Sequence, residues 1–280
     1  MIINCKEIRE KEIAKIKETY KGGCKVAFIQ VGDNPASNVY VRNKIELCKE
    51  VGIEAKHIQY NKETSQEVLL YNIEKLNNNK NIHGIMVQLP LPKHINEQDV
   101  INAIAPDKDI DGFTNVNKGK LMIGDKSAII PCTPKGIMTI LEHQGIDLNG
   151  KNVTIVGRSN IVGKPLAQLM INAGATVTVC NSKTDVERLV TSVVTSDIFV
   201  SAIGQANYFN KEFFRWCDLN YVTAIDVGIN RDEEGKLCGD IDKELYEEFK
   251  DVTSVPGGVG IMTVLEVIRN SLECYWRNKQ

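Results

Sequence analysis

The sequence predicts an α/β protein with two α/β domains and a cleft between them, the second a Rossmann-type dinucleotide-binding domain. Strand-like apolar runs alternate with amphipathic helical runs along the chain, and this alternation favours parallel sheets. A glycine turn, Gly157–Pro165 (GRSNIVGKP), stands between a strand-like run and a helix-like run. The length of 280 residues suits one large or two moderate domains with substantial cores.

The first half of the chain predicts a sheet of three strands separated by helices. The expected strands are Val26–Val31, Ile53–Tyr60 and Ile82–Val87. The expected helices are Ala36–Val51, Glu67–Asn78, Glu97–Ile104 and, as a connection, Lys135–Gln144. Between the last two, Asn115–Thr133 is expected to be irregular and to cross between domains. The LPLP turn contains Leu89–Pro90, a candidate cis bond.

The second half repeats the alternation. The expected strands are 151–156, 176–180, 197–203 and Val222–Val227. The expected helices are 164–173, 185–195, one near 211–217 and a long one from Ile261 to about Trp276. A terminal helix can return to the first domain, so the predicted domains are 1–118 plus 262–280, and 119–261.

The glycine turn predicts a dinucleotide site. The order of strand, turn and helix presents backbone N–H groups and a helix N-terminus to a pyrophosphate. Because Arg158 and Ser159 replace the usual GxGxxG spacing, a tight turn without a ligand remains an alternative. Further along the sheet, Gly204 follows another expected strand, where open α/β sheets bind ligands.

The residues after Val177–Cys180 favour NADP over NAD. NAD enzymes place Asp or Glu there to accept from the ribose 2′-hydroxyl. Here the run is Asn-Ser-Lys-Thr, so no carboxylate repels a 2′-phosphate, and Arg158, Ser182 and Lys183 could all donate to one. An ordinary polar turn would explain Ser182 and Lys183 equally well.

Composition excludes several classes of protein. A net charge of −2 without charged runs indicates neither a nucleic-acid nor a membrane partner. No apolar run reaches the roughly 18 residues of a membrane span, and the N-terminus does not resemble a signal peptide. Eight scattered cysteines without a CxxC pair predict reduced thiols in a cytoplasmic protein. The four histidines lack metal-ligand spacing, so no metal is expected.

Three segments carry residues suited to chemistry. Tyr40 and Lys44 share one face of the helix 36–51, and a lysine shielded from water beside an aromatic ring can exchange protons near neutral pH. The alternative is a surface lysine lying over a packed tyrosine. Gln88, at the end of a strand, can hold its amide over a ligand.

The acidic loop PDKDIDGF allows several interpretations. Asp109 and Asp111 could bind a metal, but the spacing lacks the rest of a calcium loop, and an Asx-type turn explains them as well. Asp111 alone could accept paired hydrogen bonds from an amino-pyrimidinone ring.

Seven motifs, taken together, resemble one family. YVRNK, GIMVQLPLP, PDKDIDGF, PCTPKG, GRSNIVGKP, IDVGINR and SVPGGVGIMT occur in the order seen in bifunctional methylenetetrahydrofolate dehydrogenase/methenyltetrahydrofolate cyclohydrolases. The resemblance runs from about Val26 to the final helix. It implies that Tyr40, Lys44 and Gln88 form the catalytic and substrate-binding group, with Gln88 orienting or tuning Lys44, and that Asp111 holds the pterin ring.

The resemblance also implies the remaining contacts and the activity. The turn bordering the folate would contribute Pro256, Gly257 and Gly258. The cofactor contacts would be Gly157, Arg158, Ser159, Gly163, Pro165, Ser182, Lys183, Gly204 and Ile229. The protein would be a homodimer of one-carbon metabolism, serving purine biosynthesis. It would oxidise 5,10-methylene-tetrahydrofolate with NADP and hydrolyse the 5,10-methenyl product to 10-formyl-tetrahydrofolate.

Three positions depart from the family pattern, and two rival functions remain. Asn181, Ser254 and Ile261 replace the usual His, Pro and Pro. The rivals are a different NADP dehydrogenase acting on a small acid, and a nucleotide-sensing protein without turnover.

Overall fold

The computed structural model describes residues 1–279, except the side chain of Ala36, and its contacts divide the chain into two compact units. The six-stranded unit comprises Met1–Lys11 and Thr133–Thr263, and the three-stranded unit comprises Glu12–Cys132 and the segment from Val264 onward. These contact-based bounds differ from the domains expected from sequence at the first eleven residues, at 119–132 and at 262–263.

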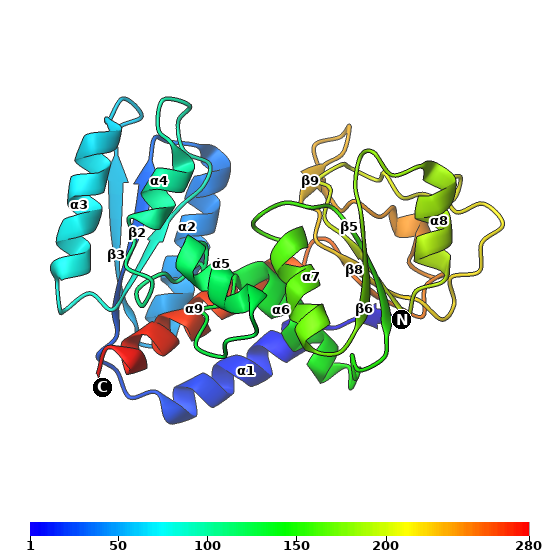
Figure 1. Ribbon diagram of the computed structural model, residues 1–280, viewed down its shortest axis with the longest axis horizontal. Helices are drawn as coiled ribbons and strands as arrows, with labels where there is room; N and C mark the ends of the chain where they lie inside the picture. The colour runs from blue at the N-terminus through cyan, green and yellow to red at the C-terminus, as the bar shows by residue number, and fades with distance from the viewer. Residues whose placement is uncertain (280) are drawn as a thin grey trace. The chain divides into compact units, whose positions relative to one another are not determined.

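The three-stranded unit is built on a parallel sheet in the order β3-β2-β4 (Figure 1). Its strands are β2 Lys25–Val31, β3 Glu54–Tyr60 and β4 Gly84–Val87. Side chains alternate along β2: Ala27, Ile29 and Val31 enter one buried cluster with Leu69 and Ile73 of the helix α3, Gln66–Asn78. Helices therefore cover this face as the hydrophobic pattern requires, and the sheet stays parallel because each strand is followed by a helix.

Six helices accompany this sheet along the chain. They are α1 Cys5–Thr19, α2 Pro35–Glu50, α3 Gln66–Asn78, α4 Glu97–Asn102, α5 Asn115–Met122 and α9 Val259–Arg277. Both α1 and α9 begin in the six-stranded unit and end in the three-stranded one.

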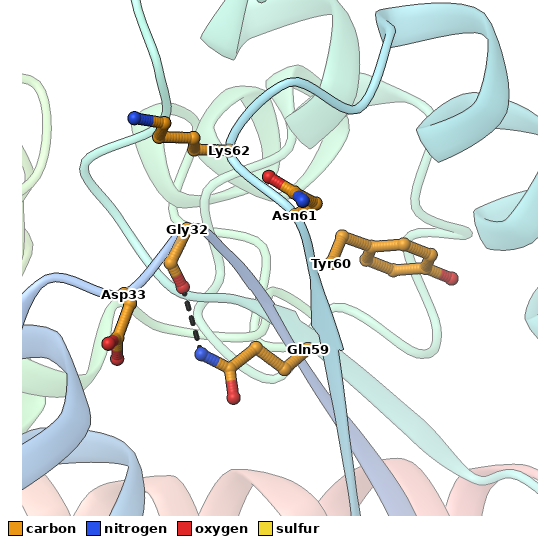
Figure 2. Close-up of a pocket in the computed structure, with 6 residues that line it drawn as sticks. All are labelled: Gly32, Asp33, Gln59, Tyr60, Asn61 and Lys62. Carbon is orange, nitrogen blue, oxygen red and sulfur yellow. Dashed lines mark hydrogen bonds between the residues drawn. The ribbon is translucent and has the colours of Figure 1, made fainter.

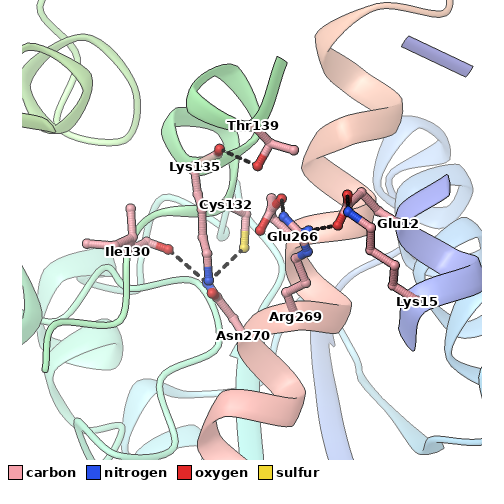
Figure 3. A network of polar contacts seen from close by, with 9 residues as sticks. All are labelled: Glu12, Lys15, Ile130, Cys132, Lys135, Thr139, Glu266, Arg269 and Asn270. Carbon is pink, nitrogen blue, oxygen red and sulfur yellow. Dashed lines mark hydrogen bonds and ion pairs between the residues drawn. The ribbon is translucent and has the colours of Figure 1, made fainter. Parts of the chain in front are cut away.

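A buried ion cluster ties the later part of α1 to α9 (Figure 3). The guanidinium of Arg269 pairs with Glu12 and with Glu266, the latter at 2.8 Å. Glu12 is 4% exposed and Glu266 is fully buried. Separating α1 from α9 would leave the buried Glu12 carboxylate without its partner Arg269, and an uncompensated buried charge is costly. The ion cluster therefore holds the two helices in contact.

The six-stranded unit has a fully parallel sheet in the order β1-β11-β8-β7-β5-β6. The strands are β1 Ile2–Ile3, β5 Asn152–Val156, β6 Thr176–Cys180, β7 Ile198–Ser201, β8 Thr223–Asp226 and β11 Asp251–Thr253. The helices are α6 Cys132–His143, α7 Gly163–Asn172 and α8 Val186–Val194, with a 3₁₀ turn, η1, at Lys243–Leu245. The short pair β9 Asn230–Arg231 and β10 Leu237–Cys238 is antiparallel.

An aromatic core fills one side of this sheet. Phe199 of β7 packs edge-on against Phe209 at 5.0 Å between ring centroids, and Phe214 and Phe249 join the same cluster. Leu189 of α8 also belongs to it. Figure 1 shows α7 and α8 on opposite sides of the sheet, as expected of a doubly wound fold.

Most predicted elements are present, and two predictions are wrong. All seven strands predicted are confirmed, with Ile82–Val87, 197–203 and Val222–Val227 shortened to β4, β7 and β8. The segment 115–133 is not irregular throughout, because α5 begins after Thr114, whose side chain accepts from the N–H of Asn117. No helix forms near 211–217: the segment is a series of turns, and Trp216 has a φ of 68°.

Candidate active site

The ammonium of Lys44 is the centre of the first set of predicted site residues. Lys44 lies on α2 and is 7% exposed. Its Nζ donates to Gln88 Oε1 at 3.0 Å and lies 3.3 Å from Met86 Sδ. Burying an ammonium is costly unless it is hydrogen-bonded, so these contacts hold it in one place. The alternative of a solvated surface lysine is therefore wrong.

The amide of Gln88 is oriented by the chain around it. Its backbone N–H donates to the carbonyl of Ile29 at 2.8 Å, and its side-chain Nε2 donates to the carbonyl of Leu89 at 2.7 Å. With the NH₂ end occupied, Oε1 is the end that faces Lys44. The Leu89–Pro90 bond is cis, as predicted. Sequence reasoning missed Met86, although a residue two before Gln88 in a strand lies on the same face.

Tyr40 precedes Lys44 by one helical turn on α2. Burial raises the pKa of its phenol, which keeps the hydroxyl protonated at neutral pH. Tyr40 therefore supplies a neutral group that can both donate and accept a hydrogen bond.

Asp111 is a carboxyl group that changes protonation near neutral pH. Burial raises its pKa to about 7, the nearby Lys44 ammonium opposes the rise, and the Asp109 carboxylate adds to it. These influences place the Asp111 carboxyl in the electrostatic neighbourhood of Lys44. Lys44 and Gln88 are thus in direct contact within the three-stranded unit, and the charge of the same ammonium acts on the Asp111 carboxyl.

Asp109 holds the loop that carries Asp111. Its carboxylate accepts from the N–H groups of Phe113 (3.2 Å) and Thr114 (2.8 Å) and from the Asn117 amide (3.0 Å). The donors lie four, five and eight residues further along the chain, beyond the reach of an Asx-type turn, and they give the Asp109 carboxylate its partners within the loop.

A second anchor comes from α9. Asn270 donates to the carbonyls of Ile110 and Ile130, each at 2.8 Å, and Figure 3 shows the Ile130 bond and the contact with Cys132. The backbone next to Asp111 is therefore fixed from two sides.

The raised pKa of Asp111 predicts a stability effect of known sign. In the unfolded chain the carboxyl ionises near 3.8, whereas in the fold it stays protonated up to about 7. Between these values the unfolded state binds fewer protons, so the stability that Asp111 contributes below pH 3.8 is lost as the pH rises through 7. We expect Asp111→Asn to gain stability relative to the wild type over this range, by up to about 4 kcal/mol.

Thermal unfolding of the ligand-free proteins at a series of pH values from 4 to 8 checks this expectation. Asp125→Asn is the matched control: hydrogen bonds from Ser127 lower the pKa of the exposed Asp125, so its contribution to stability changes only at pH values below this series, and its stability difference from the wild type should stay nearly constant. A stability difference between Asp111→Asn and the wild type that does not change with pH would contradict the assignment.

A hollow lies at the carboxyl ends of β2 and β3 (Figure 2). Its volume is about 430 Å³. It is lined by Gly32, Asp33, Gln59, Tyr60, Asn61 and Lys62. Gln59 closes one side by donating to the carbonyl of Gly32 at 3.0 Å. The sequence singled out no residue of this hollow, and it contains none of the predicted site residues.

The glycine turn after β5 is packed so closely that side chains would not fit. A Cβ on Gly157, which has a φ of 123°, would lie 2.3 Å from the carbonyl oxygen of Ala202. A Cβ on Gly163 would lie 2.1 Å from the carbonyl oxygen of Gly157. The turn is therefore tight, and α7 starts directly at Gly163, with Pro165 buried in its first turn.

Ser159 and Arg158 occupy the exposed part of this turn. Ser159 Oγ accepts from the N–H groups of Val162 (3.1 Å) and of Gly163 (3.4 Å), the first residue of α7, which folds the turn against the start of the helix. Both Arg158 and Ser159 are exposed. The exposed Arg158 guanidinium thus comes shortly before the N-terminus of α7 in the sequence, and both features favour an anionic ligand.

The loop after β6 is also open. Asn181 folds it by accepting from the N–H of Lys183 at 3.0 Å, and Ser182 and Lys183 are exposed. The carboxylate of Asp185 accepts from two N–H groups at the start of α8. Ser182 and Lys183 are therefore available to an anion.

The other predicted contacts of the six-stranded unit lie on three loops. Gly204 is exposed after β7, and Ile229 is 48% exposed after β8. The third loop follows β11: Pro256 and Gly257 are exposed, and a Cβ on Gly258 would lie 2.4 Å from the carbonyl oxygen of Ser254. Ser254, where the family has proline, donates from its hydroxyl to the carbonyl of Pro256 at 3.2 Å.

Two features are absent from residues 1–279. None of their helices is both long and apolar enough to cross a membrane. The same residues bring together no group of three or more His, Cys, Asp or Glu side chains suited to a metal ion. Seven of the eight cysteines are buried free thiols, and the eighth, Cys217, is a partly exposed one.

Two family models match the chain. The tetrahydrofolate dehydrogenase/cyclohydrolase catalytic domain matches residues 3–111, and the NAD(P)-binding domain of the same family matches residues 131–279. The chain therefore belongs to the tetrahydrofolate dehydrogenase/cyclohydrolase family.

Individual relatives cover almost the whole chain. The bifunctional protein FolD of Streptococcus thermophilus is 43% identical over 279 residues, 99% of this chain and 96% of the relative. The crystal structure of FolD from Campylobacter jejuni has a TM-score of 0.93 and 38% identity, covering 99% of both chains. The Trypanosoma brucei enzyme, whose structure contains NADP and an inhibitor, has a TM-score of 0.88 and 33% identity, covering 99% of this chain and 96% of that one.

Proposed function

We propose that this protein is a bifunctional one-carbon folate enzyme that uses NADP. It oxidises 5,10-methylene-tetrahydrofolate to the 5,10-methenyl cation and hydrolyses the cation to 10-formyl-tetrahydrofolate. The observation that carries the proposal is the buried Lys44 ammonium, hydrogen-bonded to Gln88 and close to the Asp111 carboxyl. Family membership, with two domain models in the expected order, supports both activities.

The hydrolytic step needs proton transfer. Water adds to the electrophilic methenyl carbon and loses a proton, and the ring then opens as the departing nitrogen gains one. Lys44, as the neutral amine, would accept the proton that water loses, and the ammonium so formed, held by Gln88 Oε1, would return a proton to the departing nitrogen. Tyr40 and Asp111 would bind the pterin, Asp111 as a carboxylate that accepts from two adjacent N–H groups.

The residues of the six-stranded unit suit a dinucleotide. Gly157, Arg158, Ser159, Gly163 and Pro165 belong to a turn at a helix N-terminus, and Arg158 of this turn, with Ser182 and Lys183 of the loop after β6, would hold the 2′-phosphate. NADP, when bound, accepts a hydride from the methylene carbon of the folate. The protein would align the folate with the cofactor. Gly204 and Ile229 would border the cofactor, and the Pro256–Gly258 turn would border the folate.

The remaining assignments belong to the same proposal. Residues 1–118 with 262–280 would bind the folate, and 119–261 would bind NADP. The protein would act as a cytoplasmic homodimer without a metal, in the one-carbon supply of purine biosynthesis. A binding screen of reduced folates against small hydroxy acids tests the substrate class. Binding of the acids and not the folates would favour a different dehydrogenase.

Arg158→Ala tests the choice of cofactor. We expect the KM for NADP to rise about 10- to 100-fold, because a hydrogen bond to a charged group contributes about 1.5–3 kcal/mol. The KM for NAD should change little, since NAD lacks the 2′-phosphate. Steady-state rates with both cofactors check this, with the exposed Arg188→Ala as the control. Equal use of NADP and NAD by the wild type would contradict the prediction.

A further inference from the structure

Asp240 is a fully buried carboxylate in the six-stranded unit to which sequence reasoning gave no role. It follows β10 and accepts four hydrogen bonds. Oδ2 accepts from Ser201 Oγ (2.8 Å) and the N–H of Ile203 (2.9 Å). Oδ1 accepts from the N–H of Gln205 (2.9 Å) and the side-chain amide of Asn230 (2.9 Å). Both oxygens are therefore fully used.

The donors lie along the chain just after two neighbouring strands or at their ends: Ser201 ends β7, Ile203 and Gln205 follow it, and Asn230 begins β9 after β8. Ile203 and Gln205 flank Gly204, and Asn230 follows Ile229. Gly204 and Ile229 are exposed, while the groups beside them turn inward to one carboxylate. Asp240 thus links the segments that carry Gly204 and Ile229, through hydrogen bonds on their buried side.

Asp240 is itself held in place by a second buried carboxylate. Asp226, at the end of β8, accepts from the N–H groups of Asp240 (3.0 Å), Ile241 (2.9 Å) and Gly228 (2.9 Å). A Cβ on Gly228 would lie 2.3 Å from Asp240 Oδ1. Because the space around the carboxylate is closed, the loops cannot shift without breaking these bonds.

We propose that Asp240 is a positioning residue for the dinucleotide: it clamps the loops of Gly204 and Ile229 into the conformation that binds NADP. This inference rests on the proposed function, which assigns those two residues to the cofactor. It predicts that the clamp affects the cofactor without affecting the folate chemistry of Lys44 or the discrimination of the 2′-phosphate. The folate chemistry depends on Lys44 of α2, and the discrimination of the 2′-phosphate depends on the turn after β5 and the loop after β6.

Asp240→Asn is the direct test, because it keeps the shape but replaces one acceptor oxygen by an NH₂ group. If the NH₂ group replaces Oδ2, it faces the N–H of Ile203. If it replaces Oδ1, it faces the N–H of Gln205 and the side-chain amide of Asn230. In both cases two hydrogen-bond donors oppose each other. Lost hydrogen bonds to a buried charge predict a rise of about tenfold or more in the NADP dissociation constant, measured by titration calorimetry. The KM for NADP should rise equally, and the preference for NADP over NAD should stay within about twofold of wild type.

The matched control is Asp242→Asn, the same change two residues later, where the side chain only caps the short helix η1. It should bind NADP like the wild type. Hydrolysis of the methenyl substrate, measured without cofactor, should be preserved in both variants. Asn230→Ala removes only the hydrogen bond from the segment of Ile229 to Asp240. It should raise the NADP dissociation constant about threefold or more. This variant tests the inference even if Asp240→Asn does not fold.

Three results would overturn the inference: unchanged NADP affinity in Asp240→Asn or Asn230→Ala, a parallel loss of hydrolysis, or a changed preference between NADP and NAD. Failure of the proposed function is a separate outcome. A wild type that binds NADP but oxidises no folate would refute the function, while the dissociation constants would still test the clamp.

Discussion

Lys44→Met is expected to lower the hydrolysis of 5,10-methenyl-tetrahydrofolate by about 10²–10⁴-fold, the contribution of general acid–base catalysis. Methionine keeps the length and apolar stem of lysine but carries no proton. It also leaves Gln88 Oε1 without its 3.0 Å donor. Oxidation of the methylene substrate should fall less, because hydride transfer requires alignment more than a base.

The measurement is the rate of methenyl decay, followed by absorbance with and without enzyme. Lys49→Met is the control, an exposed lysine near the end of the same helix, α2, and it should keep both activities. Wild-type hydrolysis by Lys44→Met would assign the step to another group or to free water.

Asp111→Ala is expected to raise the KM for the folate at least about 100-fold in both activities, because two charge-assisted hydrogen bonds to the pterin are lost together. The dissociation constant for NADP should not change, since the predicted cofactor residues lie in the six-stranded unit. Calorimetric titration of each ligand separates the two effects.

Asp107→Ala provides the control, since Asp107 is an exposed carboxylate of the same loop. If both activities required an added divalent ion, and Asp111→Ala abolished that requirement, the loop would be a metal site and the pterin assignment would be wrong.

The alternation of apolar runs predicted all three strands of one parallel sheet and four of the six strands of the other, and it missed the very short β1 and β11. It did not reveal α1, whose sequence CKEIREKEIAKIKET is mostly charged and whose burial depends on partners such as Arg269. The predicted helix near 211–217 failed because Phe213 and Phe214 join the aromatic cluster from a series of turns. Tertiary packing there overrides local propensity.

The site was predictable only in part for a similar reason. Tyr40 and Lys44 share a helix face, which spacing shows, but Gln88 is 44 residues further along, and only the resemblance linked it to Lys44. Asp240 gave no local signal, because its donors come from separate segments between residues 201 and 230. A clamp made across two loops becomes visible only in the fold.

The most direct test of the central claim is one assay in two stages on the purified wild type. Methylene-tetrahydrofolate and NADP are mixed with the enzyme, and the absorbance of reduced cofactor and of the methenyl product is followed. Excess methenyl-tetrahydrofolate is then supplied without cofactor. The account predicts NADP-dependent oxidation in the first stage and enzyme-dependent decay to 10-formyl-tetrahydrofolate in the second. NADP binding without either reaction would contradict it.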